Sequence, residues 1–143
     1  MNEFEPIKYE GYYGTYGYYK TQKLKNGQTI VICFHKIEFS KCNEYSIFLA
    51  IANKKKHIRQ FLSEERDVLI GKETGRCGLE GLLWAKNQII KFEESDCCKN
   101  GDYISTGWDD NRRRDVYIYG LKKLGFILGY RESRKCLYKK LVK

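Results

Sequence analysis

Short apolar runs with the composition of β-strands dominate the first half of the chain. Lys25-Asn26-Gly27 separates two of them, Tyr18–Lys23 and Thr29–Phe39. Because Asn-Gly tolerates the positive φ of a type I′ turn, this pair predicts a β-hairpin with a two-residue turn. The second run is apolar on both faces at its start, which indicates a central strand of a sheet. After a turn at Ser40–Asn43, Tyr45–Ala52 has the same character and predicts another buried strand.

The periodicity changes after Ala52. The polar segment through Lys72 predicts a long loop with one short helical turn near His57–Leu62. From Thr74 onward, apolar residues recur at helical spacing and predict a helix that ends near Ser95. The apolar positions of this helix are Leu79, Leu82, Leu83, Ile89 and Ile90.

The last third of the chain predicts a turn, a strand, a second helix and two final strands. The strand is Asp102–Trp108, and Asp109, Asp110 or Asn111 caps the helix after it. The helix stops at Gly125, a residue type that favours the left-handed conformation beyond a helix end. The face expected to be buried contains Val116, Tyr117, Leu121 and Leu124. The final strands are Phe126–Tyr130 and Lys135–Leu141.

This order of elements indicates an α/β (α+β) fold, with one mixed β-sheet and helices packed on its faces. We expect residues 1–143 to form a single domain, since the chain is long enough to bury a core without cross-links. A hydrophobic content of 42% and a single proline favour a globular protein over a disordered one.

The composition limits the classes of possible binding partner, but it does not choose one. Twenty-seven Lys and Arg against 18 Asp and Glu give a net charge of +9. This excess raises affinity for nucleic acid, phosphorylated cofactors or an acidic protein surface. A solvated basic surface explains the charge equally well.

The six cysteines do not form a recognisable metal or disulfide pattern. No C-x-x-C pair is present, and His35 and His57 are not spaced with cysteines as zinc ligands usually are. The N-terminus lacks a signal-like apolar stretch, so we expect reduced thiols in a cytoplasmic protein without a metal. No apolar run approaches the roughly 20 residues that span a bilayer, so a membrane partner is not expected.

Residues 11–19 have an unusual composition, with five tyrosines and three glycines. Aromatic residues among glycines on a basic protein can stack nucleic-acid bases. The same residues can instead form an edge strand and its loop. The sequence leaves both interpretations open.

A second glycine-containing segment, Thr74-Gly75-Arg76-Cys77-Gly78, precedes the first long helix. Backbone N–H groups at a helix start can face an anion, and the helix dipole adds about half a positive charge there. Arg76 can add a bidentate contact to a phosphate oxygen. The spacing is neither that of the Walker A loop nor that of the dinucleotide fingerprint.

The second helix ends in Lys123-Leu124-Gly125-Phe126, after a strand and an Asn-containing cap. This order, over residues 74–130, resembles the GNAT (acyl-CoA-dependent N-acetyltransferase) superfamily. The family's phosphate loop reads Arg/Gln-x-x-Gly-x-Gly/Ala, and its amides hold the pyrophosphate of acetyl-CoA. Aligned on the leucines of the first helix, these three positions fall on Thr74, Cys77 and Leu79, so the glycines are displaced.

The resemblance implies a GNAT-like fold with a splayed sheet, which transfers an acetyl group from acetyl-CoA to an amine on a small molecule or protein. It implies cofactor-binding roles for Thr74, Gly75, Arg76, Cys77, Gly78 and Asn111. The family tyrosine that protonates the CoA thiolate is replaced by Leu121. Tyr117 lies one helical turn earlier on the same face and is the candidate general acid, with an ordinary core tyrosine as the alternative.

Two questions stay open at the level of the sequence. Glu38, Glu44 and Asp109 are candidate bases, and nothing ranks them. The second functional interpretation is a protein that keeps this scaffold without catalysis and binds nucleic acid or an acidic protein. A cysteine nucleophile paired with His35 or His57 has no local support.

Overall fold

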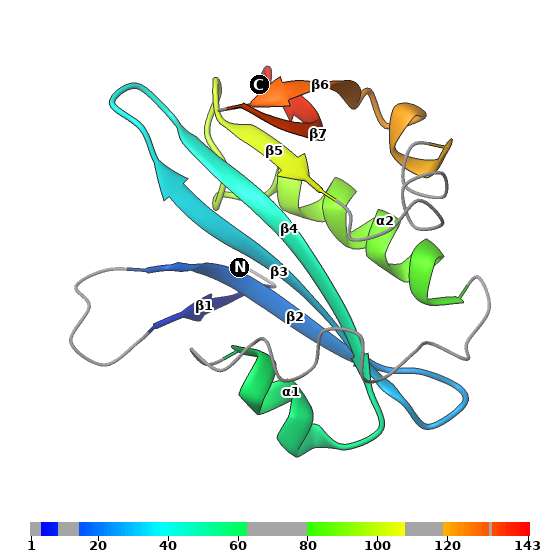
Figure 1. The fold of residues 1–143 in the computed structure, drawn as a ribbon. Coiled ribbons are helices and arrows are strands. Elements are labelled where there is room, and N and C mark those ends of the chain that lie inside the picture. Colours follow the sequence, from blue (N-terminus) through cyan, green and yellow to red (C-terminus); the bar gives the residue numbers. More distant parts are fainter. Residues whose placement is uncertain (1–3, 9–14, 63–79, 108–118, 132) are drawn as a thin grey trace.

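A computed structural model describes residues 4–8, 15–62, 80–107, 119–131 and 133–143 of the chain. Seven strands form one mixed sheet in the order β1-β2-β3-β4-β5-β7-β6 (Figure 1). Their bounds are Glu5–Ile7 for β1, Gly17–Lys23 for β2, Thr29–Glu38 for β3, Asn43–Ala52 for β4, Tyr103–Thr106 for β5, Ile127–Arg131 for β6 and Arg134–Lys140 for β7. All neighbours pair antiparallel except β4 and β5, which are parallel. The prediction of one mixed sheet with helices is confirmed at this level.

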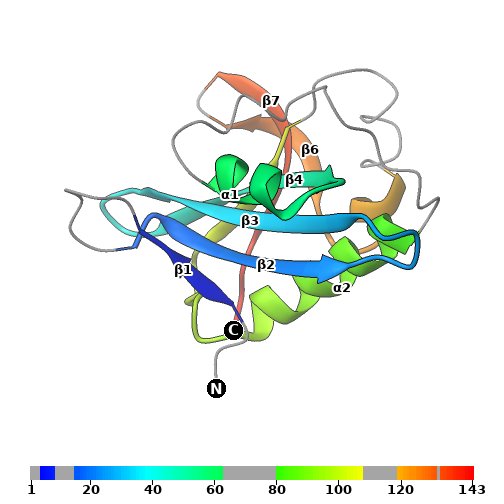
Figure 2. The same cartoon turned by 90° about the horizontal axis from the view of Figure 1, so that it is seen from below.

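Two helices cover opposite faces of the sheet (Figure 2). Helix α1, Lys55–Leu62, packs through Ile58 against a small apolar cluster on β3 and β4. Helix α2, Glu80–Glu94, lies on the other face over the larger core. The helical turn predicted near His57–Leu62 is therefore part of a longer helix.

The larger core is organised around Phe92 of α2, which is fully buried. Its ring stacks on Phe34 of β3 with centroids 3.8 Å apart and an interplanar angle of 5°. Phe4 and Tyr45 meet the same ring edge-on at 5.2 Å and 5.1 Å. Edge-to-face and offset contacts of this kind add to the stabilisation from apolar burial.

The predicted end of α2 near Ser95 is confirmed, whereas the predicted start after Thr74 lies outside the described residues. The predicted apolar face is wrong in part. The buried residues are Gly81, Ala85, Gln88, Ile89 and Phe92. Leu83 lies on the opposite side of the helix and is 58% exposed. Two small residues, Gly81 and Ala85, thus lie on the buried side of the helix together with the fully buried Phe92.

The hairpin between β2 and β3 is confirmed, but the two-residue type I′ turn is not. The Leu24 N–H donates to Gln28 O and the Gly27 N–H to Leu24 O, at 2.7 and 3.0 Å. Only Gly27 has a positive φ, of 90°, so the loop has three residues with the glycine in the left-handed position. The Asn26 side chain accepts a hydrogen bond from the Gln28 N–H at 3.0 Å, which holds this geometry without a positive φ at Asn26.

Residues 119–122 are the described end of a further helix, and the predicted stop at Gly125 is confirmed. Gly125 has a φ of 93°, its N–H donates to Lys122 O, and the Phe126 N–H donates to Leu121 O. This is a Schellman ending, and the buried Leu121 and Phe126 supply its apolar contact. Leu121 is therefore a core residue, as the helical face predicted. The predicted Val116 and Tyr117 lie outside the described residues.

Gly17 at the start of β2 is required by a close approach between strands. It has a φ of 152°, and a Cβ at this position would overlap the carbonyl oxygen of Phe34. We expect Gly17→Ala to lower the free energy of unfolding by about 1–3 kcal/mol, because the strands must move apart. Urea denaturation measures this. Gly120→Ala is the control: the position is helical and open, so stability should not fall. Equal effects of the two variants would contradict the strand-packing explanation.

Candidate functional site: a separation between parallel strands

The parallel strands β4 and β5 pair only at their beginnings. Their ladder joins Glu44 to Tyr103, Tyr45 to Ile104 and Ser46 to Ser105. Beyond it, β4 continues to Ala52, whereas Thr106 of β5 pairs with β7 on its other side. Strand β5 ends at Thr106, one residue past the ladder, so most of β4 extends beyond it (Figure 1). The short parallel ladder thus joins two antiparallel halves of the sheet.

Side chains of β4 beyond the ladder alternate between two environments. Ile47 and Leu49 pack against the larger core on the α2 face. Phe48 points to the other face, is partly exposed, and meets the His35 ring edge-on at 6.3 Å. Tyr16 stacks on the same His35 at 5.6 Å. The open part of β4 therefore has an aromatic group on the face that carries α1.

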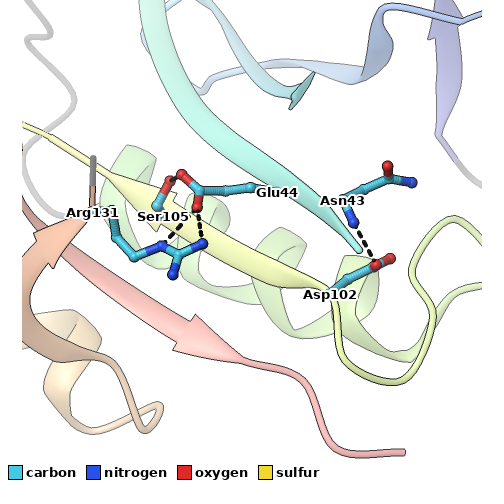
Figure 3. Close-up of polar contacts among 5 residues, drawn as sticks. All are labelled: Asn43, Glu44, Asp102, Ser105 and Arg131. Atoms are coloured by element: carbon cyan, nitrogen blue, oxygen red, sulfur yellow. Dashed lines mark hydrogen bonds and ion pairs between the residues drawn. The ribbon is translucent and has the colours of Figure 1, made fainter. Parts of the chain in front are cut away.

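A largely buried ion pair lies beside the β4–β5 ladder (Figure 3). Arg131 of β6 donates from Nε and Nη2 to Glu44 Oε1 of β4, both at 2.8 Å. Ser105 of β5 donates to Glu44 Oε2 at 2.9 Å. The Arg131 guanidinium also lies 3.9 Å from the centre of the Tyr103 ring, a cation–π geometry. These contacts link strands from both halves of the sheet.

The same contacts set the electrostatics of this network. Burial opposes the charged form of Arg131, but its hydrogen bond to Glu44 and the carboxylate charge outweigh burial and raise its pKa. Both oxygens of Glu44 accept hydrogen bonds, so this geometry favours a structural role over that of a general base. At the start of β4, Asp102 accepts a hydrogen bond from the Asn43 N–H at 2.9 Å and fixes the neighbouring turn.

The structure describes only some of the other site residues that the sequence predicts. Glu38 is exposed and pairs with Lys36 at 3.2 Å, at the far end of β3. The N-terminus of α2 lies beside the β2–β3 turn, where the Lys25 N–H donates to Glu80 at 3.2 Å. The residues that lie outside the described parts are Thr74, Gly75, Arg76, Cys77, Gly78, Asp109, Asn111 and Tyr117.

Three tyrosines of the Tyr-Gly segment have roles within the fold. Tyr16 stacks on His35, and Tyr18 packs against the larger core. Tyr19 donates a hydrogen bond to Glu5 at 2.8 Å. Tyr18 and Tyr19 thus belong to a strand, but the predicted edge position is wrong, because β2 lies between β1 and β3. Tyr12 and Tyr13 lie outside the described residues.

The described cysteines, which exclude Cys77, are all free thiols. Burial is the main cause that raises the pKa of Cys98, and burial likewise raises the pKa of Cys136. A raised pKa lowers the thiolate fraction, so neither is activated as a nucleophile. Within the described ranges, no group of three or more His, Cys, Asp or Glu side chains could hold a metal ion. None of the helices in these ranges is both long enough and apolar enough to cross a membrane.

Comparisons with protein-family models, with curated proteins and with solved structures found no match. A functional assignment therefore depends on the residues and their geometry. The Glu44–Arg131 pair was not among the sequence predictions as a pair. Its residues are 87 positions apart, and only the strand order brings them together.

Proposed function

We propose that this protein is an N-acetyltransferase that transfers an acetyl group from acetyl-CoA to an amine, on a GNAT-like scaffold. The observation that carries the proposal is the parallel β4–β5 pair, whose ladder stops after the Ser46–Ser105 pairing and leaves the rest of β4 without a described partner strand on that side. In the family that residues 74–130 resemble, the sheet is split around the cofactor. The Lys-Leu-Gly-Phe ending that carries the resemblance forms a Schellman ending followed directly by β6.

The free backbone groups of a strand edge can bind the amide-containing arm of acetyl-CoA. Past Ser46, no described strand pairs with the side of β4 that faces β5. A strand edge presents alternating N–H and C=O groups, which can pair with the amides of an extended chain. The pantetheine arm of CoA contains such amides, and its thioester carbonyl can accept an N–H hydrogen bond. An N–H placed there would stabilise the developing oxyanion.

The reaction follows from these groups. A base removes a proton from the amine, and the amine nitrogen attacks the thioester carbonyl carbon. The carbon–sulfur bond breaks, and the thiolate takes a proton from Tyr117 or from water. Since Glu44 is held in the ion pair, Asp109 and water are better candidates for the base than Glu44.

Calorimetry with acetyl-CoA, followed by CoA, tests the proposal directly. We expect saturable binding of both, and then turnover of acetyl-CoA with at least one member of a broad amine panel. Absence of binding and of turnover would overturn the proposal. That result would leave the interpretation of a non-catalytic binding protein for nucleic acid or an acidic partner.

Arg76 provides a test of where the phosphates bind. We expect Arg76→Ala to weaken acetyl-CoA binding by about 1–3 kcal/mol, because a charge-assisted contact to phosphate is lost. Arg134, exposed at the start of β7, provides the control, since Arg134→Ala makes the same change in charge elsewhere. Equal affinities of the two variants, measured by calorimetry, would place the phosphates away from Arg76.

A further inference from the structure

The two edge strands of the described sheet, β1 and β6, differ in how they are protected against pairing with a further strand. Strand β1 has three residues, including Glu5 and Pro6. A short edge strand with a charge and a proline is a poor template for pairing. Strand β6 has five residues without a proline, and all five pair with β7 in unbroken register (Figure 1). Among the described strands, β6 is therefore the edge that a further strand can extend.

The side chains of β6 leave this edge open on both faces. Arg131 is its charged residue, and the guanidinium is bound to Glu44 of β4, toward the centre of the sheet. Ile127 and Tyr130 are 58% and 68% exposed. Because Leu128 packs against the larger core on the α2 face, Tyr130 lies on that face and Ile127 on the other. An added strand would thus contact an exposed apolar or aromatic side chain on each face.

The basic charge of the chain is concentrated around this edge. Residues 119–143, which include β6 and β7, contain eight Lys and Arg and one acidic residue, Glu132. They therefore contribute +7 of the net charge of +9. Arg134 and Lys135 are exposed and pair with the last two residues of β6 in the ladder. Neither takes part in an ion pair between described residues. This charge favours an acidic partner beside β6.

We infer that the β6 edge binds an extended, acidic peptide segment of another protein as an additional strand. The peptide backbone pairs with the outward N–H and C=O groups of β6, and carboxylates of the segment lie near Arg134 and Lys135. The inference is independent of the proposed acetyl transfer, because β5 and β7 lie between β6 and β4.

Two other occupants fit this edge less well. A second copy of the chain would bring two edges with the same strong positive charge together. A nucleic acid would place phosphates beside the outward carbonyl groups of β6. It would also find one largely exposed aromatic ring on this strand, Tyr130, whereas single-stranded nucleic acids are held by several stacking rings.

Fluorescence anisotropy with a labelled peptide on the full chain tests the inference. The probe has five alternating Val and Thr residues, which favour an extended strand, and two Glu residues at each end. We expect saturable binding that is at least about tenfold tighter than that of the same peptide with Lys in place of Glu. No binding, or equal affinities for the two peptides, would overturn the inference.

N-methylated probes test whether the peptide backbone pairs with β6. Successive amides of a strand point to opposite sides, so only one alternating set of N–H groups faces β6. Methylation of that set should abolish binding, whereas methylation of the other set should leave it. If both sets tolerate methylation equally, the peptide is not bound as an added strand.

Charge-reversal variants locate the site. Arg134→Glu combined with Lys135→Glu reverses two exposed charges beside β6, so affinity for the acidic probe should fall at least about tenfold. Lys23→Glu combined with Lys25→Glu is the matched control, because both residues are exposed at the β2–β3 hairpin in the other half of the sheet. At physiological salt this distant change should matter little. Equal losses in the two double variants would contradict binding at β6.

A third double variant tests the exposed apolar contacts. Ile127→Thr combined with Tyr130→Thr places a β-branched residue at both positions, so the strand should persist while binding of the acidic probe weakens. Leu83→Ala, on the exposed side of α2, is the control and should leave binding unchanged. Unchanged affinity in a folded Ile127→Thr, Tyr130→Thr variant would contradict the assignment.

Two measurements identify a different occupant if there is one. Analytical ultracentrifugation of the chain alone should show a monomer. A dimer that the acidic probe dissociates would assign the edge to a second copy. Binding of a single-stranded oligonucleotide that is tighter than that of the probe, and that is lost in Arg134→Glu with Lys135→Glu, would assign the surface to nucleic acid. Either result overturns the inference.

Discussion

Replacing Arg131 by alanine should lower the free energy of unfolding by about 3–5 kcal/mol. The Glu44 side chain is 4% exposed, whereas that of Arg131 is 23% exposed. Removal of Arg131 therefore leaves a carboxylate in the protein interior that keeps its hydrogen bond from Ser105 but loses the cation beside it. An unpaired buried charge is far more costly than the loss of an exposed pair. Urea denaturation at neutral pH measures the change.

Two further variants separate charge burial from a general loss of packing. In the double variant Glu44→Leu with Arg131→Met, both charges are replaced by apolar groups, and most of the lost stability should return. Lys36→Ala also removes the cation of an ion pair, but the Glu38 carboxylate that it leaves is 63% exposed, so the change should cost no more than about 1 kcal/mol. If the double variant is as unstable as Arg131→Ala, the explanation by charge burial is wrong.

Tyr117→Phe should lower kcat for acetyl transfer by roughly 10²–10⁴-fold if Tyr117 is the general acid. The substitution removes only a hydroxyl group, so substrate binding and the fold should be little changed. The expectation comes from the sequence, since Tyr117 lies outside the described residues. Turnover of acetyl-CoA with the best amine of the panel gives the measurement.

Tyr119 provides the matched control for this experiment. It lies near the end of the same predicted helix, is 70% exposed, and forms a hydrogen bond with Lys123 at 3.1 Å. Tyr119→Phe therefore also removes a hydroxyl, but one that faces solvent, and kcat should stay unchanged. Full activity in Tyr117→Phe would assign that tyrosine to packing and leave water as the proton donor.

Local patterns in the sequence predicted most elements of the fold. The apolar stretch after Thr29 and the helical spacing after Thr74 each gave an element in nearly the right place. Strand β1 was not predicted, because three residues with a proline carry no period. The buried face of α2 was predicted wrongly in part, because the prediction used the large apolar residues. The buried side also contains the small residues Gly81 and Ala85.

The site was harder to predict because its geometry depends on contacts between distant segments. Nothing near Glu44 or Arg131 in the sequence indicates that they form a pair. A splayed sheet was expected only through the family resemblance, and it stays a prediction because β5 ends one residue past its ladder with β4. The buried amide of Gln88 was also missed, because a polar residue in an amphipathic helix is ordinarily assigned to its exposed side.

The short β4–β5 ladder closes the longest loop between neighbouring strands of this sheet. Strands β2, β3 and β4 are successive neighbours, and so are β6 and β7. Glu44 and Ser105, in contrast, are 61 residues apart. The connection between β4 and β5 contains both α1 and α2. The entropy lost on closing this long loop is therefore lost where β4 pairs with β5. The ion pair lies at this junction, so the contacts that offset that entropy are the ones that keep the two halves of the sheet joined.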